Sequence, residues 1–496
     1  MSTSAEELTN HLERPLGRGH SPRGAFTGAA GGTACGDLIR ISIALRPGDR
    51  DGTIEDVGFD ASGCGALVAA GSAAVALLRG RTLLEAARIG ADQIAQQLGG
   101  LSAPKRHAAE LAADALHRAL GGAARRAELA AHANRTLVAM SGGVDSAVAA
   151  LLVAQDGAEA VGVTLELWSD PENDGDLSCC SAQAVRGARE LAHGLEMPHL
   201  SIDLRAEFRA GVVDGWLADH AAGLTPNPCV RCNGNVRLDA MLELAGRLGC
   251  RTLATGHYAR VRDASEPETP GTDMDQQGPL LRTAADERKD QSYVLAALAP
   301  RSLGRLRFPL GEMHKSDVRE LAERAGLAVA RRRDSQDLCF LAGTRHGAFL
   351  ERHGGLGRRP GPIVDVTGRV LGEHAGAHSF TTGQRHGLGI GGTAPLYVLA
   401  TDTLENTVTV GPRERLLTRA MALTDVTLRR DGRAVDGVRV RSHGRLLGCH
   451  LAQPLAPGRH GSAQIELDRP AERTAPGQLA CMYSGDLLVG FATIAA

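Results

Sequence analysis

The sequence predicts an α/β protein whose middle part is a doubly wound parallel sheet, with an α+β domain before it and β structure after it. Between residues 134 and 345, strand-like runs alternate with helical stretches, as in a parallel sheet covered by helices. Before residue 130, two strand-like runs precede Ala-rich helical stretches. After residue 360, short β-branched runs are separated by turn residues, which indicates a small β domain or two.

The N-terminal segment predicts strands at residues 38–45 and 54–59, because apolar residues alternate in the first and a turn separates the two. Helices are expected from residue 66 onward. The helix at residues 108–120 is expected to stop at Gly121 and Gly122, because glycine commonly ends helices. Residues 121–133 would then form a linker or a connecting helix.

The middle segment predicts strands at residues 135–140, 160–167, 199–203 and 251–255, and helices at 182–195 and 236–248. Residues 263–278 are polar and rich in Pro and Gly, which predicts a surface loop. In the last segment, strands are expected at 406–410, 437–440 and 462–467.

A length of 496 residues suggests about three domains. The apolar fraction of 43% is ordinary for a globular protein. The net charge of -2 means that a nucleic-acid partner must be held by local patches. Candidate patches are residues 331–333, 358–359 and 429–430, although charge runs of this kind are usually solvated surface. No apolar run is long enough to span a membrane and no secretion signal opens the chain, so we expect a cytoplasmic protein. Its ten cysteines then indicate metal or sulfur chemistry rather than disulfides.

Residues 141–146, Ser-Gly-Gly-Val-Asp-Ser, follow a predicted strand and open a predicted helix. Glycines there let the backbone approach a ligand, and the helix start favours anions, so this turn predicts a pyrophosphate site with Asp145 as a Mg²⁺ ligand. The segment resembles the signature of the PP-loop ATP pyrophosphatase superfamily, which cleaves ATP between the α- and β-phosphates. No Gly-Lys-Ser/Thr follows, so it is not a Walker loop.

Six further segments, in the same order as in the family, resemble motifs of the tRNA-specific 2-thiouridylases. They are TPNPCVRCN (225–233), ATGHY (254–258), KDQSY (289–293), DSQDLCF (334–340), GQRHGLGI (383–390) and PGQ (476–478). The resemblance covers residues 134–496. It implies a PP-loop α/β domain at 134–345, a small central domain at 346–415 and a C-terminal β-barrel at 416–496.

The resemblance also implies roles for residues of this chain. ATP would be bound by Ala139, Met140, Ser141, Gly142, Gly143, Val144, Asp145, Ser146, Leu165 and Gly256. The target base would be bordered by Asn227, Pro228 and Cys229, and tRNA contacted by His257, Lys289, Asp290, Gln291, Arg441, Ser442 and Gln478. Ser442 departs from the family, in which relatives have tyrosine, and Leu165 is not the commonest residue at its position.

The activity so implied is adenylation of the C2 oxygen of the wobble uridine, uridine 34, followed by its replacement with sulfur and release of AMP and pyrophosphate. Adenylation makes a poor leaving oxygen into a good one. An ordinary cysteine is only a few per cent thiolate at neutral pH, so the sulfur must be activated.

Two mechanisms fit the cysteines. In the first, Cys339 carries a persulfide and Cys232 completes the transfer by forming a disulfide with it. In the second, Cys229, Cys232 and Cys339 ligate a [4Fe-4S] cluster whose open iron binds hydrosulfide. Cys229 favours the second, because many relatives have Asp there and thiolates are the ligands of iron–sulfur clusters. Of the other thiols, we expect Cys250, Cys449 and Cys481 to be buried and structural, while Cys179 and Cys180 precede a helix, a place where thiols can be reactive.

The first 125 residues resemble IscU-type iron–sulfur scaffolds. Ala-Cys-Gly-Asp (34–37), Gly-Cys-Gly (63–65), Ser-Pro-Arg (21–23) and the region from Lys105 carry the resemblance. It implies a metal or cluster site at Cys35, Asp37 and Cys64, with His107 as a further ligand. Ala108 stands where the scaffolds have their third cysteine, which leaves open a degenerate domain kept for docking a cysteine desulfurase.

The sequence therefore predicts a tRNA uridine 2-sulfurtransferase that uses ATP and Mg²⁺ and, in the second of the two mechanisms, a [4Fe-4S] cluster. Its partners would be tRNA and a sulfur donor such as a cysteine desulfurase or a sulfur relay protein, without a membrane. The alternatives are an iron–sulfur or sulfur carrier without base-modifying activity, or another PP-loop ligase.

Overall fold

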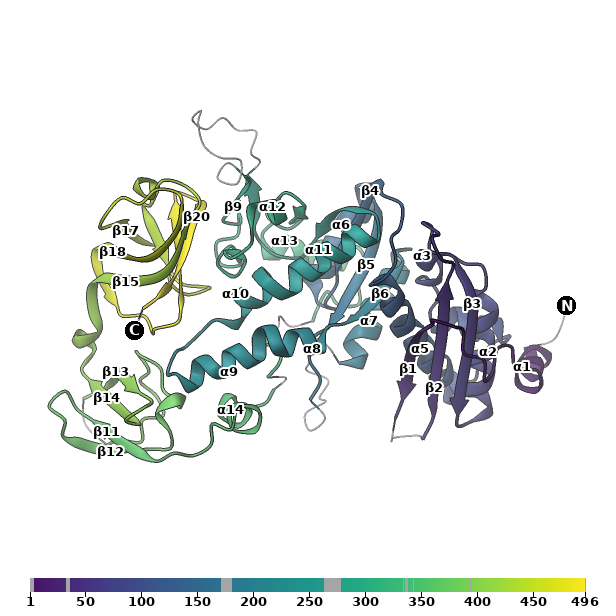
Figure 1. The fold of residues 1–496 in the computed structure, drawn as a ribbon, viewed down its shortest axis with the longest axis horizontal. Helices are drawn as coiled ribbons and strands as arrows, with labels where there is room; N and C mark the ends of the chain where they lie inside the picture. The colour runs from purple at the N-terminus through teal and green to yellow at the C-terminus, as the bar shows by residue number, and fades with distance from the viewer. Residues whose placement is uncertain are drawn as a thin grey trace.

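The structure is a computed structural model that describes residues 4–32, 36–170, 181–262, 278–332, 334, 338–341, 343–391 and 394–495. Four units follow one another along the chain (Figure 1). The N-terminal unit lies at one end of the long axis, the parallel sheet occupies the middle, and the two β-rich units lie at the other end. Cys35, Cys179, Cys180 and nearly all of the expected surface loop lie outside the described residues.

The N-terminal unit is an antiparallel three-stranded sheet with helices. The two strands expected at residues 38–45 and 54–59 are confirmed, and a further strand at residues 26–31 was not expected. Strands β1 (Phe26–Gly31), β2 (Leu38–Leu45) and β3 (Ile54–Ser62) pair in chain order. The helices are α1 (Ser4–Glu13), α2 (Gly65–Leu78), α3 (Leu83–Ala86), α4 (Ala91–Gln97), the 3-10 turn η1 (Ala103–Lys105) and α5 (Arg106–Ala124). The expected helix stop at Gly121 and Gly122 is wrong, because α5 continues through both glycines.

The middle unit contains the predicted parallel sheet, in the order β10-β7-β4-β5-β6. Its strands are β4 (His132–Ala139), β5 (Glu159–Glu166), β6 (His199–Asp203), β7 (Cys250–Ala254) and β10 (Leu306–Arg307). Its helical segments are α6 (Val144–Gln155), α7 (Ala182–Gly194), α8 (Arg205–Phe208), η2 (Arg209–Val213), α9 (Asp214–Ala221), α10 (Pro228–Cys232), η3 (Asn233–Arg237), α11 (Leu238–Arg247), η4 (Tyr293–Leu295), α12 (Pro300–Leu303), α13 (Lys315–Arg324) and α14 (His346–Gly354).

Helix α5 covers the edge strand β6 and so joins the first two units (Figure 1). Gly121 explains why the helix does not stop there: a Cβ at this position would lie 1.9 Å from the carbonyl oxygen of Ser201 in β6. The glycine therefore serves a close approach rather than a helix end. Asp114 on α5 pairs with Arg189 on α7 at 2.8 Å, with both side chains largely buried. These contacts cover a strand edge that would otherwise expose unpaired backbone groups.

The third unit is a four-stranded sheet in the order β12-β11-β14-β13, with the short turn η5 (Ala377–Ser379) packed on it. Its strands are β11 (Gly361–Val364), β12 (Val370–His374), β13 (Tyr397–Asp402) and β14 (Thr407–Gly411). A small apolar core that includes Ile363, Val398 and Val408 holds it together.

The fourth unit is a six-stranded barrel, closed by the pairing of β15 with β20. Its strands are β15 (Leu417–Leu428), β16 (Gly437–Arg439), β17 (Leu447–Leu451), β18 (Gly458–Glu472), β19 (Leu479–Ser484) and β20 (Leu487–Ile494), with the turns η6 (Arg413–Leu416) and η7 (Gly432–Ala434). The hairpin of β8 (Arg260–Arg262) and β9 (Leu280–Arg282) pairs with β20 and ties the barrel to the middle unit.

Arg429 corrects one expectation about basic patches. Its side chain is buried, donates hydrogen bonds to the carbonyl oxygens of Ala296 and Leu298, and lies over the ring of Phe491. It therefore fastens the barrel to the middle unit and does not offer a charge to a nucleic acid. In the described part of the chain, no helix is long and apolar enough to cross a membrane.

Candidate active site

The phosphate loop joins the carboxyl end of β4 to the start of α6. Gly142 has a φ of +71°, a conformation that side-chain-bearing residues rarely adopt, and Gly143 is the N-cap residue of α6. Ser146 closes the loop: its hydroxyl accepts from the backbone N–H of Ser141 at 3.1 Å and donates to the carbonyl oxygen of Gly143 at 3.0 Å. The result is a compact turn that leads into a helix N-terminus, which is a suitable place for an anion.

Gly256 lies against this loop from the next strand. A Cβ on Gly256 would be 2.7 Å from the backbone of Asp145 and Ser146, so only glycine allows the two segments to touch. The segment after β7 is thereby packed on the first turn of α6, where the sequence places the nucleotide.

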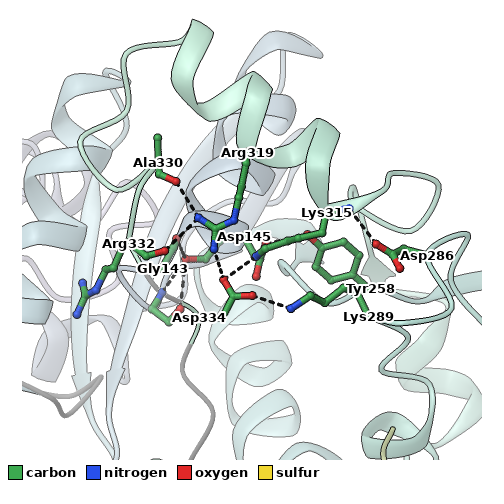
Figure 2. Close-up of polar contacts among 12 residues, drawn as sticks. Gly143, Asp145, Tyr258, Asp286, Lys289, Lys315, Arg319, Ala330, Arg332 and Asp334 are labelled. Carbon is green, nitrogen blue, oxygen red and sulfur yellow. Dashed lines mark hydrogen bonds and ion pairs between the residues drawn. The ribbon is translucent and has the colours of Figure 1, made fainter.

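Asp145 belongs to a cluster of charged side chains at the phosphate loop (Figure 2). The ammonium of Lys315 lies 2.6 Å from Asp145 Oδ1 and 3.0 Å from Asp334 Oδ1. Asp334 also pairs with Lys289 at 2.6 Å and with Arg319 at 2.7 Å. Burial raises the pKa of Asp334, but hydrogen bonds from the two lysines outweigh it and lower that pKa overall. The cluster therefore connects the phosphate loop with the segment that leads to Cys339.

Tyr258 is a second partner of Asp145, because its hydroxyl donates to Asp145 Oδ1 at 2.8 Å. Burial first, and then the charge of Asp145, raise the pKa of Tyr258 far above its ordinary value. The tyrosine thus remains a donor at neutral pH. Both donors contact the same carboxylate oxygen, Oδ1, so a Mg²⁺ ion on Asp145 would bind a carboxylate already shared with Lys315 and Tyr258.

One cavity of about 810 Å³ contains both halves of the predicted chemistry. Segments from the middle, third and fourth units line it. From the phosphate loop and its neighbours come Ala139, Met140, Ser141 and Leu165; from the cysteine segments come Asn227, Pro228, Cys229, Cys232 and Cys339; and from the expected tRNA contacts come His257, Gln291, Ser442 and Gln478. The structure therefore brings together residues that are up to several hundred positions apart in the sequence.

Cys229 and Cys232 are held by the short helix α10. Asn227 is its N-cap residue, and its side-chain oxygen accepts from the backbone N–H of Cys229 at 3.0 Å. Pro228 occupies the first helical position, where its missing N–H does no harm. Cys232 is 9% exposed and Cys229 is half-buried, and burial raises the pKa of the Cys229 thiol.

The donor chemistry of this cavity fits an iron–sulfur cluster, since three thiols line a single space. The sulfur atoms of Cys229, Cys232 and Cys339 do not all lie within 4.8 Å of one another, the spacing at which three side chains could bind one metal ion. A four-iron cluster binds each thiolate to a different iron and spreads its ligands more widely.

His257 and Gln291 border the cavity and are fixed by short-range contacts. Thr255 Oγ1 lies 2.8 Å from His257 Nδ1, and burial lowers the pKa of His257 to about 3, so the ring is neutral at pH 7. The side-chain oxygen of Gln291 accepts from the backbone N–H of Tyr258 at 2.9 Å. Gln478 donates to the carbonyl oxygen of Thr225, which joins the barrel to the segment before α10.

Three of the expected tRNA contacts lie elsewhere. Lys289 belongs to the charged cluster at Asp334. Asp290 is 1% exposed, accepts from the hydroxyl and backbone N–H of Ser292, and pairs with Arg439 of the barrel. Arg441 is exposed outside the cavity. In this structure, Asp290 thus holds the segment and the barrel together and offers no surface to a nucleic acid.

A second cluster lies in the N-terminal unit. The Cys64 thiol donates to Asp37 Oδ2 at 3.2 Å, the Cys64 backbone N–H donates to Asp37 Oδ1 at 2.9 Å, and His107 Nε2 lies 3.0 Å from Asp37 Oδ2. Their ligand atoms all lie within 4.8 Å of one another. Gly63 is required, because a Cβ there would be 2.0 Å from Asp37 Oδ1. Thiolate, carboxylate and imidazole together form a donor set that suits zinc.

Ala108 is fully buried in α5, next to His107. Where the scaffolds have a third cysteine, this chain thus has a core methyl group. Burial raises the pKa of Asp37, but hydrogen bonds from Cys64 and His107 outweigh it and lower that pKa overall. The carboxylate is therefore ionised and available to a cation.

Sequence reasoning missed several residues near the cavity. Lys315 and Arg319 have no motif around them, although Asp334, their partner, begins the DSQDLCF motif. His220 and His346 line the cavity with ring centroids 4.9 Å apart, beside the buried ring of Trp216. The three thiols expected to be structural, Cys250, Cys449 and Cys481, are buried, and burial raises the pKa of each, as expected.

Known families match the chain in four consecutive parts. They are described as NifU-like N terminal domain (residues 4–128), tRNA methyl transferase HUP domain (134–343), tRNA methyl transferase PRC-barrel domain (347–412) and Aminomethyltransferase beta-barrel domain (429–494). Each part falls on one unit of the fold, except that α14 of the middle unit lies almost entirely within the third range and β15 of the barrel precedes the fourth.

Individual relatives match over almost their whole length. The Bifunctional protein NifU/MnmA of Rubrobacter xylanophilus is 42% identical over 97% of this chain and 95% of its own. The tRNA-specific 2-thiouridylase MnmA of Thermobifida fusca is 42% identical over 73% of this chain and 95% of its own, and that of Saccharopolyspora erythraea is 41% identical over 73% and 99%. The chain therefore belongs to the NifU/MnmA family, with a NifU-like unit joined to a tRNA-specific 2-thiouridylase of the MnmA type.

Proposed function

We propose that this protein is a tRNA uridine 2-sulfurtransferase, which uses ATP to replace the C2 oxygen of the wobble uridine with sulfur. The observation that supports it most is the shared cavity: the phosphate loop at Ser141 and the thiols of Cys232 and Cys339 line one space of about 810 Å³. Activation and sulfur transfer can then take place on one bound base, without release of the activated intermediate.

In the first step, the C2 oxygen attacks the α-phosphorus of ATP, and pyrophosphate leaves with the electron pair of the broken bond. The backbone N–H groups around Gly143 and the start of α6 would bind the phosphates, and Leu165 at the end of β5 offers an apolar contact to adenine. Neutral His257 and Gln291 lie at the same cavity and would orient the base and its nucleotide.

The second step admits two routes that use the same thiols. In one, the terminal sulfur of a persulfide on Cys339 attacks C2, AMP leaves with the original oxygen, and Cys232 attacks Cys339 to release the thiolated base. A Cys232–Cys339 disulfide results, and an external thiol must reduce it for another turnover.

In the other route, Cys229, Cys232 and Cys339 would hold a [4Fe-4S] cluster. When bound, such a cluster supplies an iron without a protein ligand to carry hydrosulfide. Cys229 supports this route, because it adds a third thiol to the cavity although burial raises its pKa, and metal coordination offsets that cost.

The N-terminal unit would bind a metal or an iron–sulfur cluster through Asp37, Cys64 and His107, with Cys35 as a further ligand. The proximity of the first three supports this proposal. Because Ala108 replaces the third cysteine, we do not expect this unit to relay a persulfide.

Further proposals follow from the family. Asn227, Pro228 and Cys229 would border the target base, while Lys289, Arg441, Ser442 and Gln478 would contact tRNA. A cysteine desulfurase or sulfur relay protein would supply sulfur, Mg²⁺ would accompany ATP, and the protein would act in the cytoplasm. We retain domain boundaries of 1–125, 134–345, 346–415 and 416–496.

A reconstitution experiment tests the function. The protein is purified without oxygen and its iron is measured. It is then incubated with unmodified tRNA, ATP and Mg²⁺, either with sulfide or with a cysteine desulfurase, cysteine and a thiol reductant, because a persulfide on Cys339 needs a persulfide donor. We expect one 2-thiouridine, one AMP and one pyrophosphate for each turnover, measured by mass spectrometry. A carrier without base-modifying activity would consume no ATP, and another ligase would consume ATP without forming 2-thiouridine. An active, iron-free preparation would exclude the cluster route.

A further inference from the structure

Lys315 is held at the phosphate loop from both ends of the residue. Its backbone N–H, the first of α13, donates to Asp286 Oδ2 at 3.0 Å. Its ammonium reaches Asp145 Oδ1 at 2.6 Å, and its side chain is only 12% exposed. Figure 2 shows the side chain extending from α13 toward the loop. A cation fixed this way loses little conformational freedom when it binds a second anion.

The surrounding charges leave an excess of positive charge. The cations of the cluster are Lys289, Lys315, Arg319 and Arg332, and its carboxylates are Asp145, Asp286 and Asp334 (Figure 2). Arg332 stands on the loop itself, since Nη1 donates to the carbonyl oxygen of Gly142 at 3.0 Å. Half-buried positive charge beside the N–H groups at a helix N-terminus suits an anion with several negative charges.

We propose that Lys315 binds the β- and γ-phosphates of ATP, exchanging its contact with Asp145 for them while Asp145 takes the accompanying Mg²⁺ ion. This inference rests on the ATP-dependent step of the proposed function. When the bond between the α- and β-phosphates breaks, its bridging oxygen keeps the electron pair and pyrophosphate gains negative charge. An ammonium in a partly buried site stabilises that charge more than water does.

Arg319 provides a matched comparison. It lies one helical turn after Lys315 on α13 and pairs with the same Asp334, but its other contacts are the carbonyl oxygens of Ala330 and Arg332. It has no contact with Asp145 among those of the described residues. Removal of either side chain deletes one positive charge from the cluster, and only one of the two charges touches the phosphate loop.

Binding of an ATP analogue with a methylene bridge between its α- and β-phosphates tests the inference. With Mg²⁺ and the full chain, calorimetry should show that Lys315→Met weakens binding of the analogue at least tenfold. Binding of AMP, which lacks both outer phosphates, should change less than twofold. Arg319→Met should change neither affinity more than twofold.

Equal losses for the analogue and for AMP in Lys315→Met would overturn the inference, as would an unchanged affinity for the analogue or an equal effect of Arg319→Met. Should Lys315→Met fail to fold, Asp145→Asn and the double variant Asp145→Asn/Lys315→Met are compared, because the double variant leaves no member of the ion pair unpaired. The double variant should bind the analogue at least tenfold more weakly than the single one, and equal affinities would refute the role. No tRNA is present, so a wild type that binds ATP but never thiolates tRNA contradicts the proposed function alone.

Discussion

The side-chain oxygen of Asn227 accepts a hydrogen bond from the backbone N–H of Cys229 at 3.0 Å, and so caps the helix that ends at Cys232. The residue expected to border the target base thus also fixes the two cysteines in space. Under its proposed role, Asn227 would serve both the positioning of the thiols and the recognition of the base.

Two substitutions separate these roles. Asn227→Ala removes the cap and should cost about 1 kcal/mol of unfolding free energy, with a lower rate of thiolation. Asn227→Asp keeps a capping oxygen, so its unfolding free energy, measured by urea denaturation, should stay within about 0.5 kcal/mol of the wild type. If Asn227→Asp also retains full thiolation, the amide does not contact the base.

Gly121 and its neighbour Gly122 should respond oppositely to alanine. At Gly121 a Cβ would lie 1.9 Å from the carbonyl oxygen of Ser201, so Gly121→Ala should destabilise the docking of α5 on β6 by about 1–3 kcal/mol. At Gly122 the nearest atom would be Phe26 Cβ at 3.7 Å, an ordinary contact, so Gly122→Ala should gain about 0.5–1 kcal/mol through helix propensity. Thermal unfolding measures both, and equal shifts would contradict the observed approach of α5 to β6.

His220 should make the protein sensitive to mild acid. Burial first, and then the charges of His346 and His378, lower the pKa of His220 from 6.5 to about 4. Between these two pH values, His220 is protonated in the unfolded chain but neutral in the folded one. The free energy of unfolding therefore falls as pH drops from about 6.5 toward 4. His220→Phe, which keeps a ring against Trp216, should flatten this part of the curve of unfolding free energy against pH. An unchanged slope would assign the acid sensitivity to other groups.

The thiols should divide into two classes toward alkylation of the native protein. Among the cysteines that the structure describes, Cys64 is exposed and should react first. Cys250 and Cys449 are buried, and burial raises the pKa of each to about 12, so almost none of either is thiolate at pH 8. Mass spectrometry of peptides after a short exposure to iodoacetamide measures the order. Early labelling of Cys250 or Cys449 would show that the native packing around them opens readily.

The sequence predicts the chemistry of this site better than its supporting contacts. Contiguous motifs such as residues 141–146 and 225–233 stand out in the sequence, so the phosphate loop and the cysteine segment could be located before the fold was known, although the helix α10 within the second was not expected. The predicted helix end at Gly121 is wrong because the sequence alone does not distinguish a glycine that ends a helix from one that allows close contact with a neighbouring strand. Lys315 meets Asp145 across 170 positions, and nothing local marks that contact. Arg429 and Asp290 are charged residues that the fold buries against partners in another unit.

In the proposed reaction, the C2 oxygen of uridine leaves on AMP while sulfur takes its place. Unmodified tRNA with heavy oxygen at C2 of the wobble uridine tests this directly, through the mass of the AMP formed in a single turnover with ATP and either sulfide or a cysteine desulfurase with cysteine as the sulfur source. We expect one AMP with a single heavy oxygen for every 2-thiouridine formed. The Cys339→Ser variant should make no 2-thiouridine. Formation of 2-thiouridine with unlabelled AMP would contradict the proposed reaction, because the oxygen would then leave by a route that does not involve adenylation.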